Sequence, residues 1–292
     1  MIRLASSLLS VDVLPEVGGK IGQITEMLSG TKFLVSPQKE YRTVPHDGDW
    51  LRHDTSGMDD CFPNVAAGLY PDEPWSTLHL PDLGEWTHGS WDVLNAGKRQ
   101  VVMTQAGRVL PYSAIKTVQF IDEGTLEFSY RVRNRGQSPM RFLWSAHPLI
   151  SVEDVYKLEL PGEKLALRSF PDDGFQHTWP ILEEMDLSRQ WIMRGKSRKV
   201  FVTGLADGWC SLWLPRHKLH FTFDLEVLPA VGLWFNHYAF PAWNDRQFRC
   251  IAVEPCTSPS DLLDELDISR YPRIPPQDTA VWSMRLSIEP LT

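Results

Sequence analysis

The chain has 292 residues, of which 42% are hydrophobic and 23% charged, a balance typical of a folded protein with a sizeable core. Its formal net charge is −8, and this disfavours nucleic acid as a partner, because nucleic-acid binders usually carry a basic surplus. The same balance argues mildly against a highly phosphorylated substrate.

The N-terminal stretch and the cysteines predict a cytoplasmic protein. The first apolar run is too short for a secretory signal, and Asp12 interrupts it. No run approaches the ~18 apolar residues of a membrane-spanning helix, so no membrane partner is expected. No Cys-x-x-Cys pair occurs, which predicts reduced thiols and neither a zinc site nor a disulfide framework. The cysteines are Cys61, Cys210, Cys250 and Cys256.

Residues 40–92 are loop-rich and crowded with His, Asp, Pro and Trp. Long ordered loops over a β scaffold tend to carry function. Asp59 and Asp60 are adjacent here, and neighbouring side chains of an extended chain point to opposite sides, so a joint metal site is not expected. We expect at least one of the two to cap the loop, and we predict that Asp60 contacts a ligand.

Most of the remaining chain reads as strands. Clear period-2 runs cover 125–136, 219–227 and 280–290, with Gly, Pro, Asn or Asp between such runs. A helix is predicted over 258–267, which has a serine N-cap followed by proline, and 179–191 could hold a helical turn or two. The pattern predicts one all-β domain over residues 1–292, with two large antiparallel sheets packed face to face. If the sheets curve strongly, a concave outer face becomes a binding groove.

His147 and Glu254 each lie near the end of a run that reads as a buried strand, and a proline follows each of them. Burying a carboxylate is costly, so Glu254 is either salt-bridged or a general base with a raised pKa. His147 is either a satisfied core histidine or an imidazole aimed into a cleft, because the His–Pro step disfavours helical geometry.

The stretch 219–240 contains Asp224, Trp234 and Asn236, and the last two share one face of a strand. A sugar site uses an acidic acceptor, an aromatic platform and an amide. The alternative is that Trp234 belongs to the core and Asn236 to a turn. The same two alternatives apply to the 12 tryptophans of the chain, which either pack in the core or line an aromatic cleft.

A resemblance to a known family runs from about residue 12 to the C-terminus. It is carried, in this order, by LPEVGGKIGQI (14–24), GMDDCFPNV (57–65), LPDLGEWTHGSWDV (80–93), WSAHPLI (144–150) and AVEPCTSPSD (252–261). These segments resemble the aldose 1-epimerase (galactose mutarotase-like) superfamily, and more narrowly a bacterial aldose 1-epimerase-related branch.

This resemblance implies a β-supersandwich that binds a sugar in a concave groove and needs no cofactor. Glu254 would take the proton of the anomeric hydroxyl, and His147 would protonate the ring oxygen, so that the C1–O5 bond opens. Rotation about C1–C2 and reclosure would give the other anomer. Such roles require pKa values near the working pH.

The chain departs from the family pattern at Leu83, where the family usually has a second histidine that contacts the sugar near its ring oxygen. His79 and His88 lie on either side of this position and are the candidates to replace it. In an extended chain His79, but not His88, shares the face of residue 83.

Three functions follow as expectations. The first is an isomerase that interconverts the α and β anomers of an aldose, acting on a small-molecule sugar as a monomer or homodimer. The second is a carbohydrate-binding protein of the same fold with weak or lost catalysis, as Leu83 indicates. The third is a sugar-phosphate epimerase, which would need Arg52, Arg141 and Arg246 to converge on a phosphate.

Overall fold

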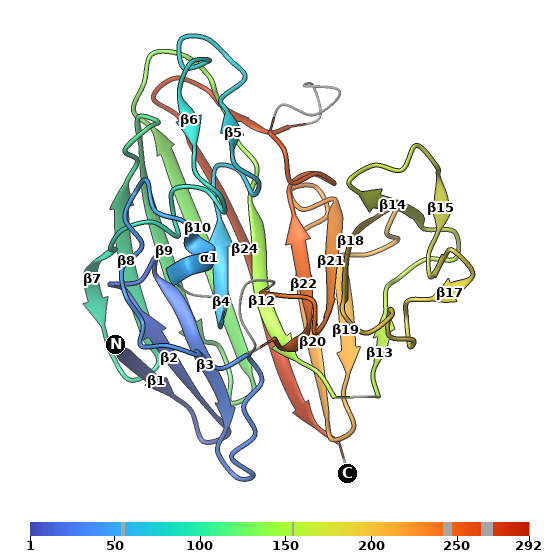
Figure 1. Cartoon of the computed structure of the whole chain (residues 1–292). Helices are drawn as coiled ribbons and strands as arrows, with labels where there is room; N and C mark the ends of the chain where they lie inside the picture. The colour runs from blue at the N-terminus through green and yellow to red at the C-terminus, as the bar shows by residue number, and fades with distance from the viewer. Residues whose placement is uncertain (54–55, 154, 242–246, 264–270, 292) are drawn as a thin grey trace.

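Two large antiparallel sheets make up most of the computed structural model (Figure 1). The structure describes residues 1–292 except 54–55, 154, 242–246, 264–270 and 292. In this view the N-terminus lies at the left edge and the C-terminus at the bottom. The predicted all-β class is confirmed.

The first sheet has twelve strands within the described residues. Their spatial order is β1 (Ile2–Ala5), β2 (Leu9–Leu14), β3 (Lys20–Glu26), β4 (Met58–Cys61), β12 (Ser145–Ser151), β22 (Arg249–Cys256), β21 (Ala230–His237), β18 (Lys196–Thr203), β14 (Ala166–Phe170), β15 (His177–Thr178), β16 (Ile181–Leu182) and β17 (Met185–Asp186).

The second sheet has eight strands in the part of the chain that the structure describes. Their order is β13 (Lys157–Glu159), β19 (Trp209–Trp213), β20 (His217–Phe223), β24 (Thr279–Pro290), β10 (Thr125–Asn134), β9 (Tyr112–Phe120), β8 (Gln100–Ala106) and β7 (Asp92–Ala96). Smaller elements are the pairs β11 (Met140–Arg141) with β23 (Arg273–Ile274) and β5 (Gly68–Leu69) with β6 (His79–Leu80), and the short helix α1 (Trp50–His53).

The main core lies between the two sheets. Strands β9 and β10 alternate buried and more exposed positions, so one face of each packs inward. One continuous cluster of buried side chains joins the sheets, with Phe128 and Trp282 from the second sheet and Leu233 and Val253 from the first. This packing accounts for the period-2 signal of residues 125–136 and 280–290, where the predicted strands are confirmed as β10 and β24.

The central strands of the first sheet are buried on both faces. Nearly every residue of β12, β21 and β22 is shielded from solvent. One face contacts the core, and loops cover the other. A strand buried on both faces shows no alternation in its sequence, which is why these strands read as plain apolar runs.

Two predicted elements need correction. Of the helix predicted over 258–267, the described part, 258–263, is not helical: the Ser260 hydroxyl bonds the backbone of Leu262, with Oγ accepting from its N–H and donating to its carbonyl, both at 3.1 Å. Residues 264–267 lie outside the described part. Instead of a helical turn, 179–191 contains the short strands β16 and β17.

The strand predicted over 219–227 ends at Phe223, because the Asp224 carbonyl accepts the N–H groups of Val227 and Leu228 in a turn. In the described part of the chain, no helix has the length and apolarity needed to cross a membrane.

Candidate functional site

A cavity of about 320 Å³ lies on the outer face of the first sheet, over its central strands. The register places Leu149 of β12 opposite Ala252 of β22, then Trp234 of β21, Lys199 of β18 and Phe170 of β14. All of these except Ala252 line the cavity. Four of these five adjacent strands therefore supply one row of side chains that forms part of its wall.

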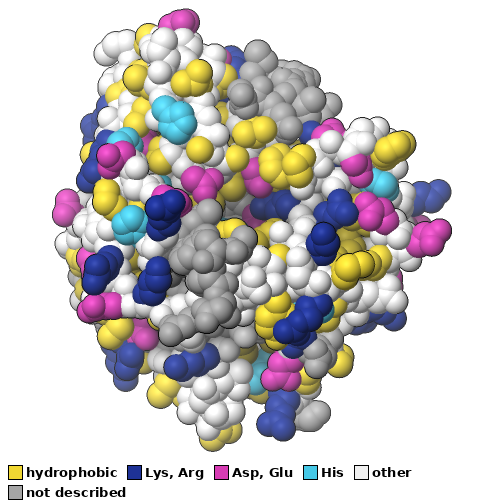
Figure 2. All heavy atoms as spheres, in the orientation of Figure 1, with side chains coloured by type: hydrophobic (Ala, Val, Ile, Leu, Met, Phe, Trp, Pro, Cys, Tyr) yellow, Lys and Arg dark blue, Asp and Glu magenta, His cyan; other side chains and the backbone are white. Residues whose placement is uncertain are grey.

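Loops complete the cavity from the side opposite the sheet. They contribute Val65, Ala66, Asp82, Leu83, Phe240 and Asp261, and helix α1 contributes Trp50. Most of the wall is apolar or aromatic, with four titratable groups among it: Asp82, His147, Lys199 and Asp261. Figure 2 shows acidic, basic and hydrophobic side chains close together near the middle of this face.

His147 and Glu254 form a hydrogen-bonded pair beside the cavity. The Nδ1 atom of His147 lies 3.1 Å from Oε1 of Glu254 on the adjacent strand. His147 lines the cavity, whereas Glu254 does not and is 0% exposed. The imidazole lies near two tryptophans, with its ring centre 6.0 Å from that of Trp234 and 6.3 Å from that of Trp50. His147 faces a cleft as predicted, with Glu254 behind it, but it lies inside β12 and not at the end of a strand.

Lys199 determines the charge of Glu254. Its ammonium forms a short ion pair with Oε2 of Glu254 and a second one, at 3.3 Å, with Asp261. Burial raises the pKa of Glu254, but Lys199 and His147 outweigh this effect and lower it to about 2. Of the two alternatives for Glu254, the structure shows the salt-bridged carboxylate, and the alternative of a raised pKa is wrong. Because an ionised carboxylate can only accept hydrogen bonds, we assign Nδ1–H of His147 as the donor to Oε1 of Glu254.

Gly232 makes room for this ion pair. It lies on β21, between the strands of Lys199 and Glu254, and pairs with Glu254 in the register. A Cβ atom at this position would lie 3.3 Å from Oε2 of Glu254 and 3.2 Å from the Phe201 ring. A side chain here would crowd the route by which Lys199 reaches across β21.

Two carboxyl groups of the cavity wall have raised pKa values. Burial raises the pKa of Asp82, and His147 opposes the shift only in part. Burial also raises the pKa of Asp261, against the opposing effect of Lys199. These groups and His147 are able to exchange protons with a ligand in the cavity.

Two further predicted residues belong to this region. Trp234 lines the cavity, as expected for an aromatic platform. Asn236 does not line it and is fully buried. Its side chain accepts from the backbone N–H groups of Ala239 and Phe240 and donates to the Phe248 carbonyl. Asn236 therefore shapes the loop that brings Phe240 to the cavity.

Asp60 and Asp224 lie away from the cavity, contrary to expectation. Asp60 is buried between the sheets, where it pairs with Lys116 at 2.5 Å and accepts the Tyr130 hydroxyl at 2.7 Å. Asp224 is in the turn after β20, and its carboxylate accepts the Glu226 N–H at 2.9 Å. Both have local structural partners that account for an acidic side chain at these positions.

The two histidines flanking Leu83 do not replace the missing one. His79 is exposed on β6 and does not line the cavity. His88 is buried, and its ring nitrogens lie 2.9 Å from the Gly84 carbonyl and 3.2 Å from the Gly48 carbonyl. Burial lowers the pKa of His88. Leu83 itself lines the cavity, with a backbone φ of 59°, which is uncommon for leucine.

The arginines considered for a phosphate do not converge in the described structure. Arg52 is exposed and lies 3.2 Å from Asp49. Arg141 is buried and holds Asp72 through two hydrogen bonds of 2.9 and 2.6 Å. Arg246 lies outside the described residues.

Sequence reasoning missed Lys199, Asp82 and Asp261 as cavity residues. Asp82 and Asp261 could have been proposed from the sequence, because both are in segments that carry the family resemblance. The sequence signal for Lys199 was weaker. Lys199 is a charged residue in an apolar strand, and it shares one face of that strand with Phe201, two residues away. Nothing local indicated that its ammonium crosses a neighbouring strand. Among the described residues, no three His, Cys, Asp or Glu side chains group together as metal ligands would.

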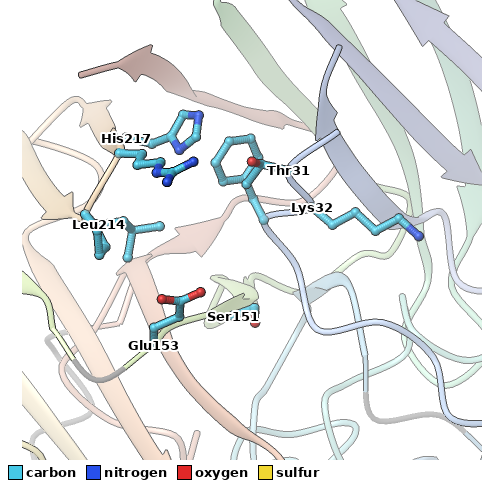
Figure 3. Close-up of a pocket in the computed structure, with 9 residues that line it drawn as sticks. Thr31, Lys32, Ser151, Glu153, Leu214 and His217 are labelled. Atoms are coloured by element: carbon cyan, nitrogen blue, oxygen red, sulfur yellow. The ribbon is translucent and has the colours of Figure 1, made fainter. Parts of the chain in front are cut away.

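A larger hollow, of about 440 Å³, lies elsewhere, where residues 31–33 meet the turn between β19 and β20 (Figure 3). Lys32 points away from it, and Glu153 and His217 approach it from different elements. The His217 ring packs edge-on against Phe33 at 5.0 Å, and burial lowers the pKa of His217. We locate the candidate site in the smaller cavity, because His147 and Glu254 meet there.

No family model and no curated protein matches the sequence. Solved structures do match over nearly the whole chain. The Slr1438 protein from Synechocystis sp. PCC 6803 has a TM-score of 0.75 at 15% identity, covering 98% of this chain and 94% of its own. An Escherichia coli K12 protein whose name proposes an aldose 1-epimerase also has a TM-score of 0.75 at 15% identity, covering 99% of each chain.

A galactose mutarotase related enzyme from Lactobacillus acidophilus has a TM-score of 0.71 at 14% identity, covering 98% of this chain and 96% of its own. At such identities the likeness concerns the fold, whereas activity depends on the particular side chains of the site. The chain therefore has the galactose mutarotase-like fold, a β-supersandwich of large antiparallel sheets.

Proposed function

We propose that the protein binds an aldose in the cavity over β12, β21 and β18 and interconverts its α and β anomers by acid–base ring opening. One observation carries the proposal. His147 lines the cavity and is oriented from behind by an ionised carboxylate, Glu254, at 3.1 Å. This arrangement fixes the ring and leaves Nε2 as the nitrogen that is free to exchange a proton with a ligand.

The chemistry requires one acid and one base. His147 protonates the ring oxygen while a carboxylate accepts the proton of the anomeric hydroxyl, and the C1–O5 bond breaks. Rotation about C1–C2 followed by the reverse steps returns both protons and gives the other anomer. The reaction changes no oxidation state, so it requires no electron acceptor.

The walls of the cavity suit a sugar ring. Trp50, Phe170, Trp234 and Phe240 supply flat apolar faces, and Asp82 and Asp261 supply acceptors for hydroxyl groups. Packing of C–H faces on aromatic rings, combined with a few polar contacts, is the usual composition of a small-molecule site.

The test follows the loss of optical rotation of pure α anomers, starting with glucose and galactose and extending to a broad panel of aldoses. We expect faster equilibration with protein than with buffer, and a rate about 10²–10⁴-fold lower in His147→Asn. His79→Asn is the matched control, because His79 is exposed and lies outside the cavity. No acceleration with any aldose would exclude the proposed reaction.

A second candidate is a carbohydrate-binding protein without efficient turnover. It is favoured by the complete burial of Glu254 under Lys199 and by Leu83, which offers no hydrogen-bond donor to the sugar. Calorimetry that detects sugar binding, together with NMR exchange spectra in which the anomers interconvert no faster than in buffer, would select this candidate.

A further inference from the structure

The titratable groups at the cavity form two layers. Asp82, His147, Lys199 and Asp261 line it, whereas Glu254 lies behind them and is 0% exposed. A base that takes a proton from a sugar hydroxyl must come within hydrogen-bond distance of it. The front layer is therefore where the base is to be sought.

Both oxygens of Glu254 are already occupied. Oε1 accepts from His147, and Oε2 accepts from Lys199 and, at 3.3 Å, from the Ser145 hydroxyl. The lowered pKa of Glu254 also makes it a weak proton acceptor. Its contacts suit a different role, which is to orient His147 and to stabilise the imidazolium.

Lys199 and Asp261 are engaged as well. They form an ion pair at 3.3 Å, so a proton accepted by Asp261 would remove the negative charge that pairs with Lys199. Burial lowers the pKa of Lys199, but Asp261 and Glu254 outweigh this and raise it, so the ammonium keeps its proton.

Asp82 is the remaining carboxylate of the wall. Within the described residues no cation forms an ion pair with it, in contrast to Asp261 and Glu254. The charged groups that face it are His147 on β12, Asp261 in the loop after β22, and Asp49 before α1. Burial raises the pKa of Asp82, which makes it a stronger proton acceptor than an exposed aspartate.

We propose that Asp82 is the catalytic base that accepts the proton of the anomeric hydroxyl, and that Glu254 is a positioning residue for His147. This rests on the proposed function, anomer interconversion in the same cavity. The O1–H proton passes to Asp82, the C1–O5 bonding pair moves to O5, and O5 takes a proton from His147. After rotation, Asp82 returns its proton to the oxygen that becomes O1–H, and His147 recovers its own.

The test compares Asp82→Asn with Glu254→Gln in the pH profile of anomer exchange, measured by NMR. The active form has Asp82 deprotonated and His147 protonated. We expect Asp82→Asn to lower kcat by about 10²-fold or more with KM little changed, and to remove the acidic limb of the profile. We expect Glu254→Gln to keep the acidic limb and to lower kcat, because His147 loses the carboxylate that orients its ring.

Asp92→Asn, which makes the same charge change on the exposed strand β7, should leave the profile unchanged. The reverse pattern, in which Glu254→Gln removes the acidic limb and Asp82→Asn keeps it, would overturn the inference while leaving the proposed function intact. Wild-type protein that exchanges the anomers of no aldose would overturn both.

A second measurement does not depend on turnover. The carboxyl carbon of Asp82, assigned in the NMR spectrum by its loss in Asp82→Asn, should titrate above the range of exposed aspartates. Its midpoint should rise further in His147→Asn. An ordinary midpoint that does not respond to His147→Asn would contradict the role of Asp82 whatever the activity.

Discussion

At the scale of single residues, Lys199 controls where negative charge can reside in the site. It is the only lysine that lines the described cavity, and it pairs with both Glu254 and Asp261. A buried carboxylate without a cation pays the full cost of desolvation. The ion pair therefore explains how Glu254 stays ionised in the middle of a sheet.

Replacing Lys199 by methionine should destabilise the protein by about 3–5 kcal/mol at neutral pH, because Glu254 keeps its charge without its main partner. In the wild type the lowered pKa of Glu254 contributes stability that is complete above 4.5 and is lost as the pH falls toward about 2. With the lysine gone, the pKa of Glu254 rises, so this contribution shrinks and acidification costs the variant less stability than it costs the wild type.

Urea unfolding followed across this pH range measures the effect. The double variant Lys199→Met/Glu254→Gln is the control, and it should recover part of the lost stability at neutral pH. An unchanged pH dependence of the free energy of unfolding in Lys199→Met would show that the ion pair does not hold Glu254 ionised.

Leu83 is the second residue whose replacement is informative. It faces the cavity with a φ of 59°, a conformation that histidine tolerates better than leucine does. Leu83→His would place a ring N–H donor beside the bound sugar. Since a hydrogen bond to a developing charge contributes about 1.5–3 kcal/mol, we expect kcat/KM for anomer exchange to rise about tenfold or more.

Leu83→Phe controls for the added ring, because it has no N–H group. Polarimetry of both variants with one aldose separates the two effects. An equal change in both variants would mean that the shape of the cavity, and not the donor, limits the rate.

At the scale of elements, local sequence pattern predicts a strand well where one face is exposed. β10 and β24 alternate and were predicted nearly to their ends. β20 ends before the pattern does, because Asp224 begins a turn. The helix expected from Ser258 is missing in its described part, where serine bonds its neighbours locally and Thr257 is tied to Trp144 across the fold. Tertiary contacts of this kind are not visible in local propensities.

The loop after β21 is an element on which the cavity depends. Asn236→Ala would remove four hydrogen bonds to the backbone of residues 239, 240 and 248. We expect a loss of about 1–3 kcal/mol in the free energy of unfolding, because buried backbone groups are left without partners. Sugar affinity should also fall, since Phe240 is no longer held against the cavity.

Urea unfolding and calorimetric titration with the preferred aldose measure these two effects. Asn236→Asp keeps the acceptor oxygens but places a carboxyl group without a cation against the Phe240 and Phe248 carbonyls, and it should be at least as destabilising as alanine. Full sugar affinity in Asn236→Ala would mean that this loop does not shape the site.

At the scale of the whole molecule, strand pairing assembles the site from distant parts of the chain. The neighbouring order β12, β22, β21, β18 and β14 brings together residues 147, 254, 232, 199 and 170. Periodicity within one strand carries no information about such pairing. The sequence therefore predicted His147 and Trp234 as cavity residues, but Lys199 could be found only from the pairing.

The same assembly sets the charge of the cavity. Lys199 is shared between Glu254 and Asp261, and Asp82 adds a further carboxylate. Neither Arg52 nor Arg141 reaches the cavity, since neither lines it and each has an aspartate partner. With three carboxylates against Lys199 and His147, and a net charge of −8 on the chain, the described site has no cation left over for a phosphate.

We therefore expect a phosphorylated aldose to bind at least about tenfold more weakly than its neutral parent. The negative charge of the protein repels the phosphate dianion, and the described cavity has no arginine to bind it. Calorimetric titration of the two sugars under identical conditions measures this preference. Added salt should reduce it by screening the repulsion, while leaving the affinity of the neutral sugar nearly unchanged. Tighter binding of the phosphorylated sugar, weakened by salt, would mean instead that the cationic groups dominate the cavity and that the substrate is a sugar phosphate.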